Sequence, residues 1–248
     1  MQSSWANEYL FWNDRYGKIY HHLEGSTPYK KLIDDIINFL PLRDGLTILD
    51  AGVGSGYLVE RVISRFRPLN IVALDISPIQ LAHFKKRIET KFPSVRNSIR
   101  TDLHDLCHKT NYSNGYFDLI ISNLVLTYIT EYEGSYGINA LGGVLREMYR
   151  ILKLGGILCW STPIPNVKFW KIFLASYKDI LDPHHLERLY FAPRILHHAL
   201  SIQRKGREGI YHFYQQERII DILNSIGYKD IIVKRSFANQ ALIFRCSK

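Results

Sequence analysis

The residues with the clearest chemical potential are three carboxylates and a glycine-rich stretch. Asp50 directly precedes the loop Gly52-Val53-Gly54-Ser55-Gly56. Bare glycine backbone at a strand-to-helix turn lets a ligand approach closely. Asp75 stands 23 positions after Gly52, where an acid commonly accepts hydrogen bonds from ribose hydroxyls. Asp102 follows a third β-like run. The pattern predicts a site for a ligand that contains a ribose.

The acid before the loop bears on which ligand fits. In the dinucleotide fingerprint the third glycine comes five residues after the first, whereas Gly56 comes four after Gly52. A pyrophosphate prefers a helix N-terminus without a neighbouring carboxylate. S-adenosylmethionine carries an ammonium, a sulfonium and a single carboxylate. We therefore expect it as the cofactor, with Asp50 facing the ammonium, the glycine amides facing the carboxylate, and Asp102 facing the adenine amino group.

The elements that must position these residues alternate between short apolar runs and helical patterns, which is typical of a parallel α/β sheet. Ser77, Pro78 and Gln80 form a helix start signal after the second run. The connection 235–240 is too short for a crossover helix, so the last two strands are predicted to be an antiparallel hairpin. The expected strands are 46–51, 71–74, 95–101, 117–122, 157–160, 231–234 and 241–246.

The alternation breaks between residues 163 and 212, which hold four prolines and two His-His pairs without strand patterning. We interpret this stretch as an inserted helical substrate cap. The division expected for the chain is an N-terminal helical segment over the cofactor (1–45), an α/β core (46–162 and 213–248) and the cap (163–212).

Five motifs in register resemble those of the class I S-adenosylmethionine-dependent methyltransferases of the small-molecule type. They are Ile-Leu-Asp-Ala-Gly-Val-Gly-Ser-Gly (48–56), Ala-Leu-Asp-Ile-Ser (73–77), Thr-Asp-Leu (101–103), Phe-Asp-Leu-Ile-Ile-Ser-Asn (117–123) and Leu-Arg-Glu-Met-Tyr-Arg-Ile-Leu-Lys-Leu-Gly-Gly (145–156). The resemblance implies a Rossmann-like, seven-stranded, mostly parallel sheet of order 3-2-1-4-5-7-6 with strand 7 antiparallel.

The resemblance also implies which positions contact the cofactor. The aromatic stretch 12–20 is similar to an N-terminal helix that folds over the cofactor in small-molecule members, so Tyr16 or Tyr20 would reach the methionine end. Plain packing of an amphipathic helix is the alternative for both tyrosines. The full set of implied cofactor residues is Tyr16, Asp50, Gly52, Gly54, Gly56, Asp75, Ile76, Gln80, Asp102, Leu103, Asn123 and Leu124.

Methyl transfer is an in-line displacement at an activated carbon. Orientation alone can supply roughly 7–11 kcal/mol of the barrier reduction, so a dedicated catalytic residue is not required, and the sequence identifies none clearly. The weak candidates are Tyr20, Tyr128 and His197. The acceptor atom, whether oxygen, nitrogen or carbon, stays open. Because the His-His pairs point apart on a helix and no ligand cluster is visible, no metal site is expected.

The charge balance narrows the acceptor. The chain has 32 Lys and Arg against 23 Asp and Glu, a net charge of +9, which permits nucleic acid, a membrane face or an anionic substrate. The stretch 122–125 lacks the Pro-Pro-aromatic motif that is typical of enzymes that methylate the amino groups of nucleobases. Nucleic acid is therefore disfavoured as the methyl acceptor. The cap has eight basic and four acidic residues and many aromatics. We therefore expect a small aromatic or apolar acceptor, with an anionic group as an option.

Other functions stay open at this stage. A relative that binds S-adenosylmethionine but catalyses a non-methylating step such as cyclisation, an RNA or protein methyltransferase, and a non-enzymatic binding module are the alternatives. Three distant cysteines, no apolar leader and no run of about 18 apolar residues predict a cytoplasmic protein without a membrane span. Its oligomeric state, monomer or homodimer, does not follow from the sequence.

Overall fold

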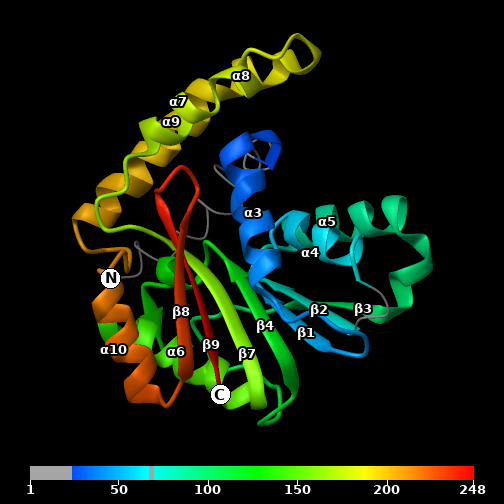
Figure 1. Cartoon of the computed structure of the whole chain (residues 1–248), viewed down its shortest axis with the longest axis vertical. Coiled ribbons are helices and arrows are strands. Elements are labelled where there is room, and N and C mark those ends of the chain that lie inside the picture. The colour runs from blue at the N-terminus through cyan, green and yellow to red at the C-terminus, as the bar shows by residue number, and fades with distance from the viewer. Residues whose placement is uncertain (1–23, 67–69) are drawn as a thin grey trace.

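The computed structural model of the chain describes residues 24–66 and 70–248. A central sheet is covered by helices on both faces, and a helical arm extends over one end of it (Figure 1). The predictions for Tyr16 and Tyr20 lie outside the described residues. The helices are α3 (Thr27–Phe39), α4 (Tyr57–Ile63), α5 (Pro78–Lys91), α6 (Ile138–Ile151), α7 (Phe169–Ala175), α8 (Tyr177–Ile180), α9 (Leu186–Arg207) and α10 (Gln216–Ile226), with short 3-10 turns η3 (Pro93–Ser98), η4 (Leu126–Tyr128) and η5 (Pro183–His185).

The main sheet has seven strands in the order β3-β2-β1-β4-β7-β9-β8. Strand β9 runs antiparallel to both of its neighbours, and the other pairings are parallel. A separate hairpin, β5 (Glu131–Tyr132) and β6 (Ser135–Tyr136), precedes β7, so β7 is the fifth strand of the main sheet. The predicted class I methyltransferase topology is therefore confirmed. The seven strands are β1 (Thr47–Ala51), β2 (Asn70–Asp75), β3 (Ile99–Leu103), β4 (Phe117–Asn123), β7 (Leu152–Pro163), β8 (Lys229–Ser236) and β9 (Ala241–Ser247).

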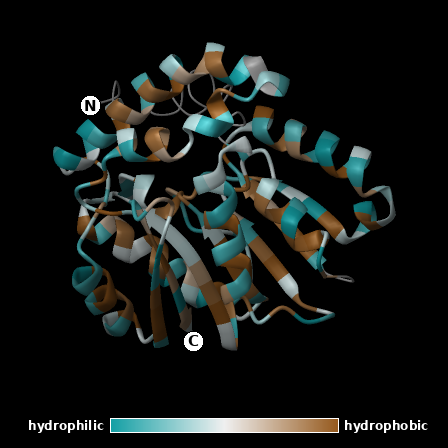
Figure 2. Cartoon of the chain, turned by 45° about the horizontal axis from the view of Figure 1, so that its top comes forward, coloured by the Kyte–Doolittle hydropathy of each residue, from teal (hydrophilic) through white to brown (hydrophobic). Residues whose placement is uncertain are grey.

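Alternating side chains of the strands belong to two separate hydrophobic cores, because neighbouring residues in a strand point to opposite faces of the sheet. Ile48 packs with helices α3, α4 and α5, and Leu49 packs with α6 and α10 on the other face. Figure 2 shows the resulting pattern, with largely apolar strands and helices striped along their length. Both faces of the inner strands are buried, which is expected where helices cover a parallel sheet.

The predicted bounds of two strands are wrong. The third was expected over 95–101, but Pro93 to Ser98 form a 3-10 turn and the strand begins at Ile99. The fifth was expected over 157–160, after a helix stopped by Gly155-Gly156. The helix ends at Ile151 instead, and β7 begins at Leu152, before the glycines. Pairing with β4 and β9 outweighs local helix preference there.

The inserted region is helical, as predicted. Helices α7, α8 and α9 form the arm at the top of Figure 1, and α7 and α9 pack side by side. Among the described residues, no helix is both apolar and long enough to cross a lipid bilayer.

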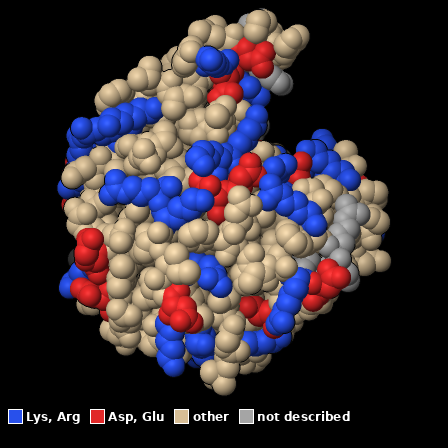
Figure 3. Space-filling model, viewed as in Figure 1, with Lys and Arg blue, Asp and Glu red and all other residues tan. Residues whose placement is uncertain are grey.

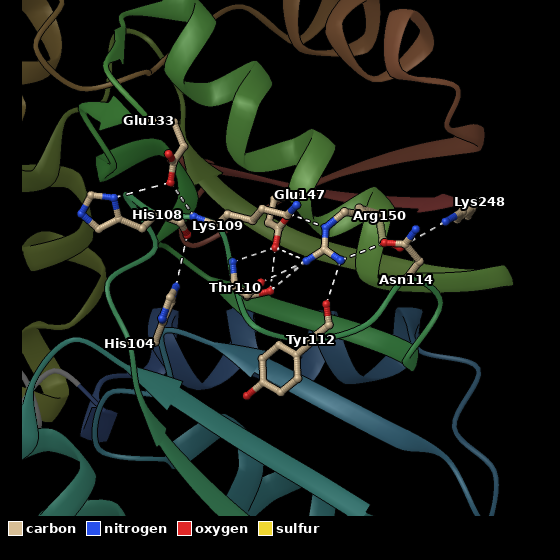
Figure 4. Close-up of polar contacts among 10 residues, drawn as sticks. All are labelled: His104, His108, Lys109, Thr110, Tyr112, Asn114, Glu133, Glu147, Arg150 and Lys248. Carbon is tan, nitrogen blue, oxygen red and sulfur yellow. Dashed lines mark hydrogen bonds and ion pairs between the residues drawn. The ribbon is translucent and has the colours of Figure 1, made fainter.

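A buried ion pair fixes the long connection between β3 and β4. The Glu147 carboxylate accepts hydrogen bonds from the Thr110 amide (2.8 Å) and hydroxyl (2.6 Å) and from Arg150 (2.7 Å). Arg150 also donates to the Tyr112 carbonyl at 2.7 Å, as Figure 4 shows. These bonds lower the pKa of Glu147 despite burial, the largest opposing effect. The connection is therefore held against α6 on one side while its other side borders the site described below.

Gly56 allows the turn into α4 and the close approach of α5. Its φ is +84°, and an added Cβ would lie 2.2 Å from Cδ2 of the buried Phe84. Gly45 has nearly the same φ, +79°, with nothing within 4 Å. We expect Gly56→Ala to lower the free energy of unfolding by about 3 kcal/mol, from strain and overpacking. Gly45→Ala should cost about 1 kcal/mol. Urea denaturation checks both, and equal losses would contradict the packing role.

Candidate functional site

A cavity of about 240 Å³ lies at the carboxyl ends of β1, β2 and β4, beneath the cap. This is where ligands bind in open α/β sheets. One end is bordered by the glycine loop, Asp50 and Asp75, and the other by apolar side chains of the cap. The cavity therefore has a polar half and an apolar half.

The glycine loop is fixed by hydrogen bonds within the protein. The amides of Gly52 and Val53 both donate to the Leu74 carbonyl, at 2.8 and 2.9 Å, and the Gly54 amide donates to Asp75 Oδ2 at 2.8 Å. The Gly56 amide donates to the Val53 carbonyl. The prediction that these amides face a cofactor carboxylate is therefore wrong, because all three glycine N–H groups are already engaged. The loop instead contributes a rigid wall.

Asp75 is held in one orientation at the end of β2. Its Oδ1 accepts the Ser77 amide at 2.9 Å, and its Oδ2 accepts the Gly54 amide. The Ser77 hydroxyl in turn accepts the Gln80 amide, the predicted helix cap. Burial raises the pKa of Asp75, and the backbone donors oppose that rise. Each carboxylate oxygen keeps acceptor capacity for a further donor.

Asp50 is the least compensated group in the cavity. Its side chain is 2% exposed, and its Oδ2 has no hydrogen-bond partner among the described residues. Burial, followed by repulsion from Asp75, raises the pKa of Asp50 to about 8. A buried, unpaired carboxyl is costly unless a donor or cation meets it. The site is therefore short of one positive or hydrogen-bond-donating group beside Asp50.

A support for the loop was missed by the sequence analysis. The Ser55 hydroxyl donates to Glu24, which also accepts Arg87 of α5 at 2.7 Å. Glu24 is buried, and burial raises its pKa while Arg87 opposes the rise. Residues 24, 55 and 87 are far apart in the chain, so spacing alone carried no signal for this contact.

The expected adenine residues fall outside the cavity. Asp102 accepts a short hydrogen bond from the Tyr112 hydroxyl, and Leu103 is 60% exposed; neither borders the cavity. The following residues, from His104 to Cys107, border it instead. The carboxylate on this side is Asp105, whose Oδ1 accepts the Cys107 amide at 2.9 Å. The third strand was expected to end at residue 101, whereas β3 ends at Leu103, so the residues that border the cavity come later in the chain.

Asn123 and Leu124 are brought into the cavity wall as predicted. Asn123 Oδ1 accepts the Ser161 hydroxyl at 2.7 Å, and its Nδ2 donates to the Tyr29 hydroxyl at 3.1 Å. The Leu124 amide donates to Ser161 Oγ, and Leu124 has a left-handed φ of 55°. Tyr29 of α3 was not identified from the sequence. Its ring places a hydroxyl at the junction of the two halves.

Of the two catalytic candidates within the described residues, Tyr128 borders the cavity and His197 does not. Tyr128 borders the cavity and packs edge-on against Tyr211 and Phe213. His197 is exposed and does not border the cavity. Helix α9 directs Ile195 and Ala199 inward, and a residue two positions after Ile195 points about 200° away. The candidacy of His197 is therefore wrong.

Of the remaining implied residues, Gly52, Gly54, Ile76 and Gln80 border the cavity, whereas Gly56 caps α4 behind it. Within residues 24–66 and 70–248, no group of three or more His, Cys, Asp and Glu side chains could hold a metal ion.

Comparisons with known proteins show which proteins the chain is similar to. Residues 49–160 match the family model of a methyltransferase domain. Malonyl-[acyl-carrier protein] O-methyltransferase of Acetivibrio thermocellus is 28% identical over 135 residues, which cover 54% of this chain and 42% of that protein. A 2-methyl-6-phytyl-1,4-hydroquinone methyltransferase of Oryza sativa subsp. japonica is 27% identical over 162 residues, covering 65% and 44%. The chain therefore aligns with less than half the length of these curated relatives.

A solved structure extends the similarity of fold beyond the matched domain. Phosphoethanolamine N-methyltransferase 2 of Haemonchus contortus, in complex with S-adenosyl-L-methionine, aligns with a TM-score of 0.64 and 16% identity, covering 96% of this chain and 59% of that one. Together with the sheet order, these matches show a stretch similar to a methyltransferase domain at residues 49–160, within a chain whose fold is that of S-adenosylmethionine-dependent methyltransferases.

The raised pKa of Asp50 predicts a pH-dependent effect on stability. Between about pH 4 and pH 8 the carboxyl is ionised in the unfolded chain and protonated in the folded one, so the wild-type protein loses stability as pH rises. We expect Asp50→Asn to remove this loss. Its gain in free energy of unfolding over wild type should grow by about 2 kcal/mol from pH 5 to pH 7. Urea denaturation measures it, with the exposed Asp44→Asn as control; a pH-independent difference would contradict the pKa assignment.

Proposed function

We propose that this protein is a methyltransferase that binds S-adenosylmethionine against the glycine loop and transfers its methyl group to an apolar small molecule held under the cap. The observation that carries the proposal is the partnerless oxygen of Asp50 in the wall of the cavity. An ammonium is the group that such a carboxyl lacks, and the methionine part of this cofactor supplies one.

The other polar residues of the cavity suit the remaining parts of the cofactor. Asp75 has acceptor capacity left on both oxygens, which fits a pair of ribose hydroxyls. Asp105 takes the adenine role that was expected of Asp102. Gly52 has Val125 packed against it, 2.5 Å from where a Cβ would lie, so this part of the wall has no room for a side chain at position 52. When bound, the cofactor supplies an activated methyl group.

The apolar half of the cavity supports an uncharged acceptor. Cap residues Phe169, Ile172, Phe173, Ile195 and Ala199 border it, and no Lys or Arg of the described chain does. The basic residues of the cap lie on its other sides, so the option of an anionic acceptor is dropped. Burying an anion in such a space without a partner would be strongly unfavourable.

The protein's own contribution to the reaction is mainly orientation. Asn123 is fixed by Ser161 and presents its amide to the Tyr29 hydroxyl, so Tyr29 and Tyr128 offer the polar atoms at the junction between the two halves. Both hydroxyls can hold a polar atom of the acceptor on the axis of the methyl group. The cap excludes water from the apolar side. An oxygen, nitrogen or carbon acceptor is compatible with these groups.

One of the comparisons supports a small apolar acceptor. The two curated relatives are named for malonyl-[acyl-carrier protein] and for 2-methyl-6-phytyl-1,4-hydroquinone, and only the second of these is a small, largely apolar molecule. Formation of S-adenosylhomocysteine on incubation with S-adenosylmethionine and an alkylated or prenylated hydroquinone tests the proposal directly. Turnover of such a compound without S-adenosylhomocysteine would favour a non-methylating reaction such as cyclisation. S-adenosylhomocysteine formed only with RNA or protein would favour those acceptors instead, and cofactor binding without any turnover would favour a binding module.

The cofactor assignment distinguishes two nearby carboxylates. We expect Asp105→Asn to weaken S-adenosylmethionine binding by about fivefold to tenfold, because a charged acceptor for the adenine amino group is lost. Asp102→Asn should change the dissociation constant by less than about twofold, since Asp102 lies outside the cavity. Asp75→Ala should raise the dissociation constant for S-adenosylmethionine by about tenfold or more. Isothermal titration calorimetry measures all three, and a larger effect at Asp102 than at Asp105 would contradict the assignment.

The acceptor assignment predicts a split between binding and turnover. Ala199→Trp places a large ring in the apolar half of the cavity, so methyl transfer should fall by about 100-fold or more. S-adenosylmethionine binding, which uses the polar half, should change by less than about threefold. The adjacent Leu200→Trp is the matched control, because Leu200 is exposed. Loss of cofactor binding and turnover together in Ala199→Trp would contradict the division of the cavity.

A further inference from the structure

The side of the cap away from the cavity has a concentration of exposed apolar side chains. Of the thirteen large hydrophobic residues exposed in the described part of the chain, seven lie between positions 170 and 200. None of the seven borders the cavity. Exposed hydrophobic residues are normally scattered singly, and a gathered patch marks an interaction surface. The patch is therefore unexplained by the site beneath it.

On the first limb of the cap the exposed residues follow helical spacing. They recur at intervals of four, three and four residues, which places them on one face of α7 and its continuation into α8. Phe169 and Ile172, which border the cavity, lie on another face. The exposed set is Trp170, Leu174, Tyr177 and Leu181.

Helix α9 shows the same division. Ile195 and Ala199 face the cavity, whereas Leu189, Tyr190 and Leu200 are exposed, each about a third of a turn or more around the helix from Ile195. We call these three residues, together with the four of the first limb, the outer cap face. Two packed helices thus direct one apolar side inward and a second apolar side to solvent.

Basic side chains accompany the aromatic residues of the outer cap face. Lys171 lies over Trp170 at 5.9 Å, Lys178 over Tyr177 at 5.8 Å, and Arg194 lies 6.0 Å from the ring of Tyr190. In Figure 3 the arm is largely tan, with groups of blue along it and red groups beside the blue ones near its tip.

The acidic residues of the cap are fewer, and some of them are engaged. The Asp179 carboxylate accepts the Thr27 amide and hydroxyl, and Glu208 lies near Arg204. Exposed aromatic and aliphatic residues flanked by Lys and Arg are the composition of helices that lie in a lipid interface.

We infer that the outer cap face docks on an anionic membrane surface and lets an apolar acceptor pass from the bilayer to the cavity beneath the cap. Charge complementarity favours this occupant over a second copy of the chain, because each aromatic residue of the outer cap face has a Lys or Arg beside it, whereas the Asp179 carboxylate is bound to Thr27. The statement about the acceptor rests on the proposed function, but docking itself requires neither cofactor nor acceptor.

Vesicle sedimentation of the full chain tests the docking. Two vesicle types are compared, one of phosphatidylcholine alone and one containing about 30% phosphatidylglycerol. Wild-type protein should bind the anionic vesicles, and binding should weaken as salt is raised. Leu174→Ser with Tyr190→Ser should lower the partition coefficient by at least about tenfold. The matched control, Leu154→Ser with Tyr136→Ser, removes a more exposed leucine and a similarly exposed tyrosine away from the cap and should change the partition coefficient by less than about twofold.

Two double variants that reverse lysine charges refine the test. Lys171→Glu with Lys178→Glu should weaken binding far more than Lys85→Glu with Lys86→Glu, which changes net charge equally on exposed positions of α5. Absence of binding to anionic vesicles, or equal losses in cap and control variants, would overturn the inference. So would a concentration-dependent dimer, seen by analytical ultracentrifugation, that the cap variant alone dissociates. Titration with S-adenosylmethionine on the same samples separates the outcomes, because a failed titration with intact vesicle binding contradicts the proposed function alone.

Discussion

Two buried carboxylates in one cavity are the constraint on which the site depends. Asp75 is compensated by the amides of Gly54 and Ser77, whereas Asp50, which repels it, has an oxygen without a partner. The folded protein tolerates this because the pKa of Asp50 is raised, so that the group stays neutral near pH 7. A cationic ligand changes that balance, since it stabilises the ionised form. The energy lost by burying Asp50 is recovered only on binding.

The glycine loop contributes shape rather than hydrogen bonds. Its glycine amides already donate hydrogen bonds to Leu74, Asp75 and Val53, so they are not available to a ligand. Its positive φ angles and lack of side chains allow Val125 to pack against Gly52 and Phe84 against Gly56, and they leave open space beside Gly54. The Glu24 contact to Ser55 fixes the same loop from outside. A rigid wall of this kind suits a reaction that depends on orientation.

The sheet could be predicted from sequence because its determinants are local. Buried strands give apolar runs, and the short connection before β9 requires an antiparallel partner. The same reasoning located Asp50, Asp75 and Asn123 at strand ends. It predicted Asp102 at the cavity, where Asp105 lies instead, because the end of the third strand was predicted two residues too early. Tyr29 and Glu24 carried no signal, since their contacts join segments that are distant along the chain.

The cap shows why the chemical class of the methyl acceptor could not be predicted from composition alone. An excess of basic residues in 163–212 is compatible with an anionic ligand inside or with an anionic surface outside, and a sum of charges does not distinguish them. The packing of α7 against α9 does, because it turns Ile172 and Ala199 inward and leaves Lys171 and Arg194 outside. One helix pair thereby has two apolar sides with different neighbours, the cavity on one and basic residues on the other. The proposed acceptor, a molecule soluble in lipid, is compatible with both sides.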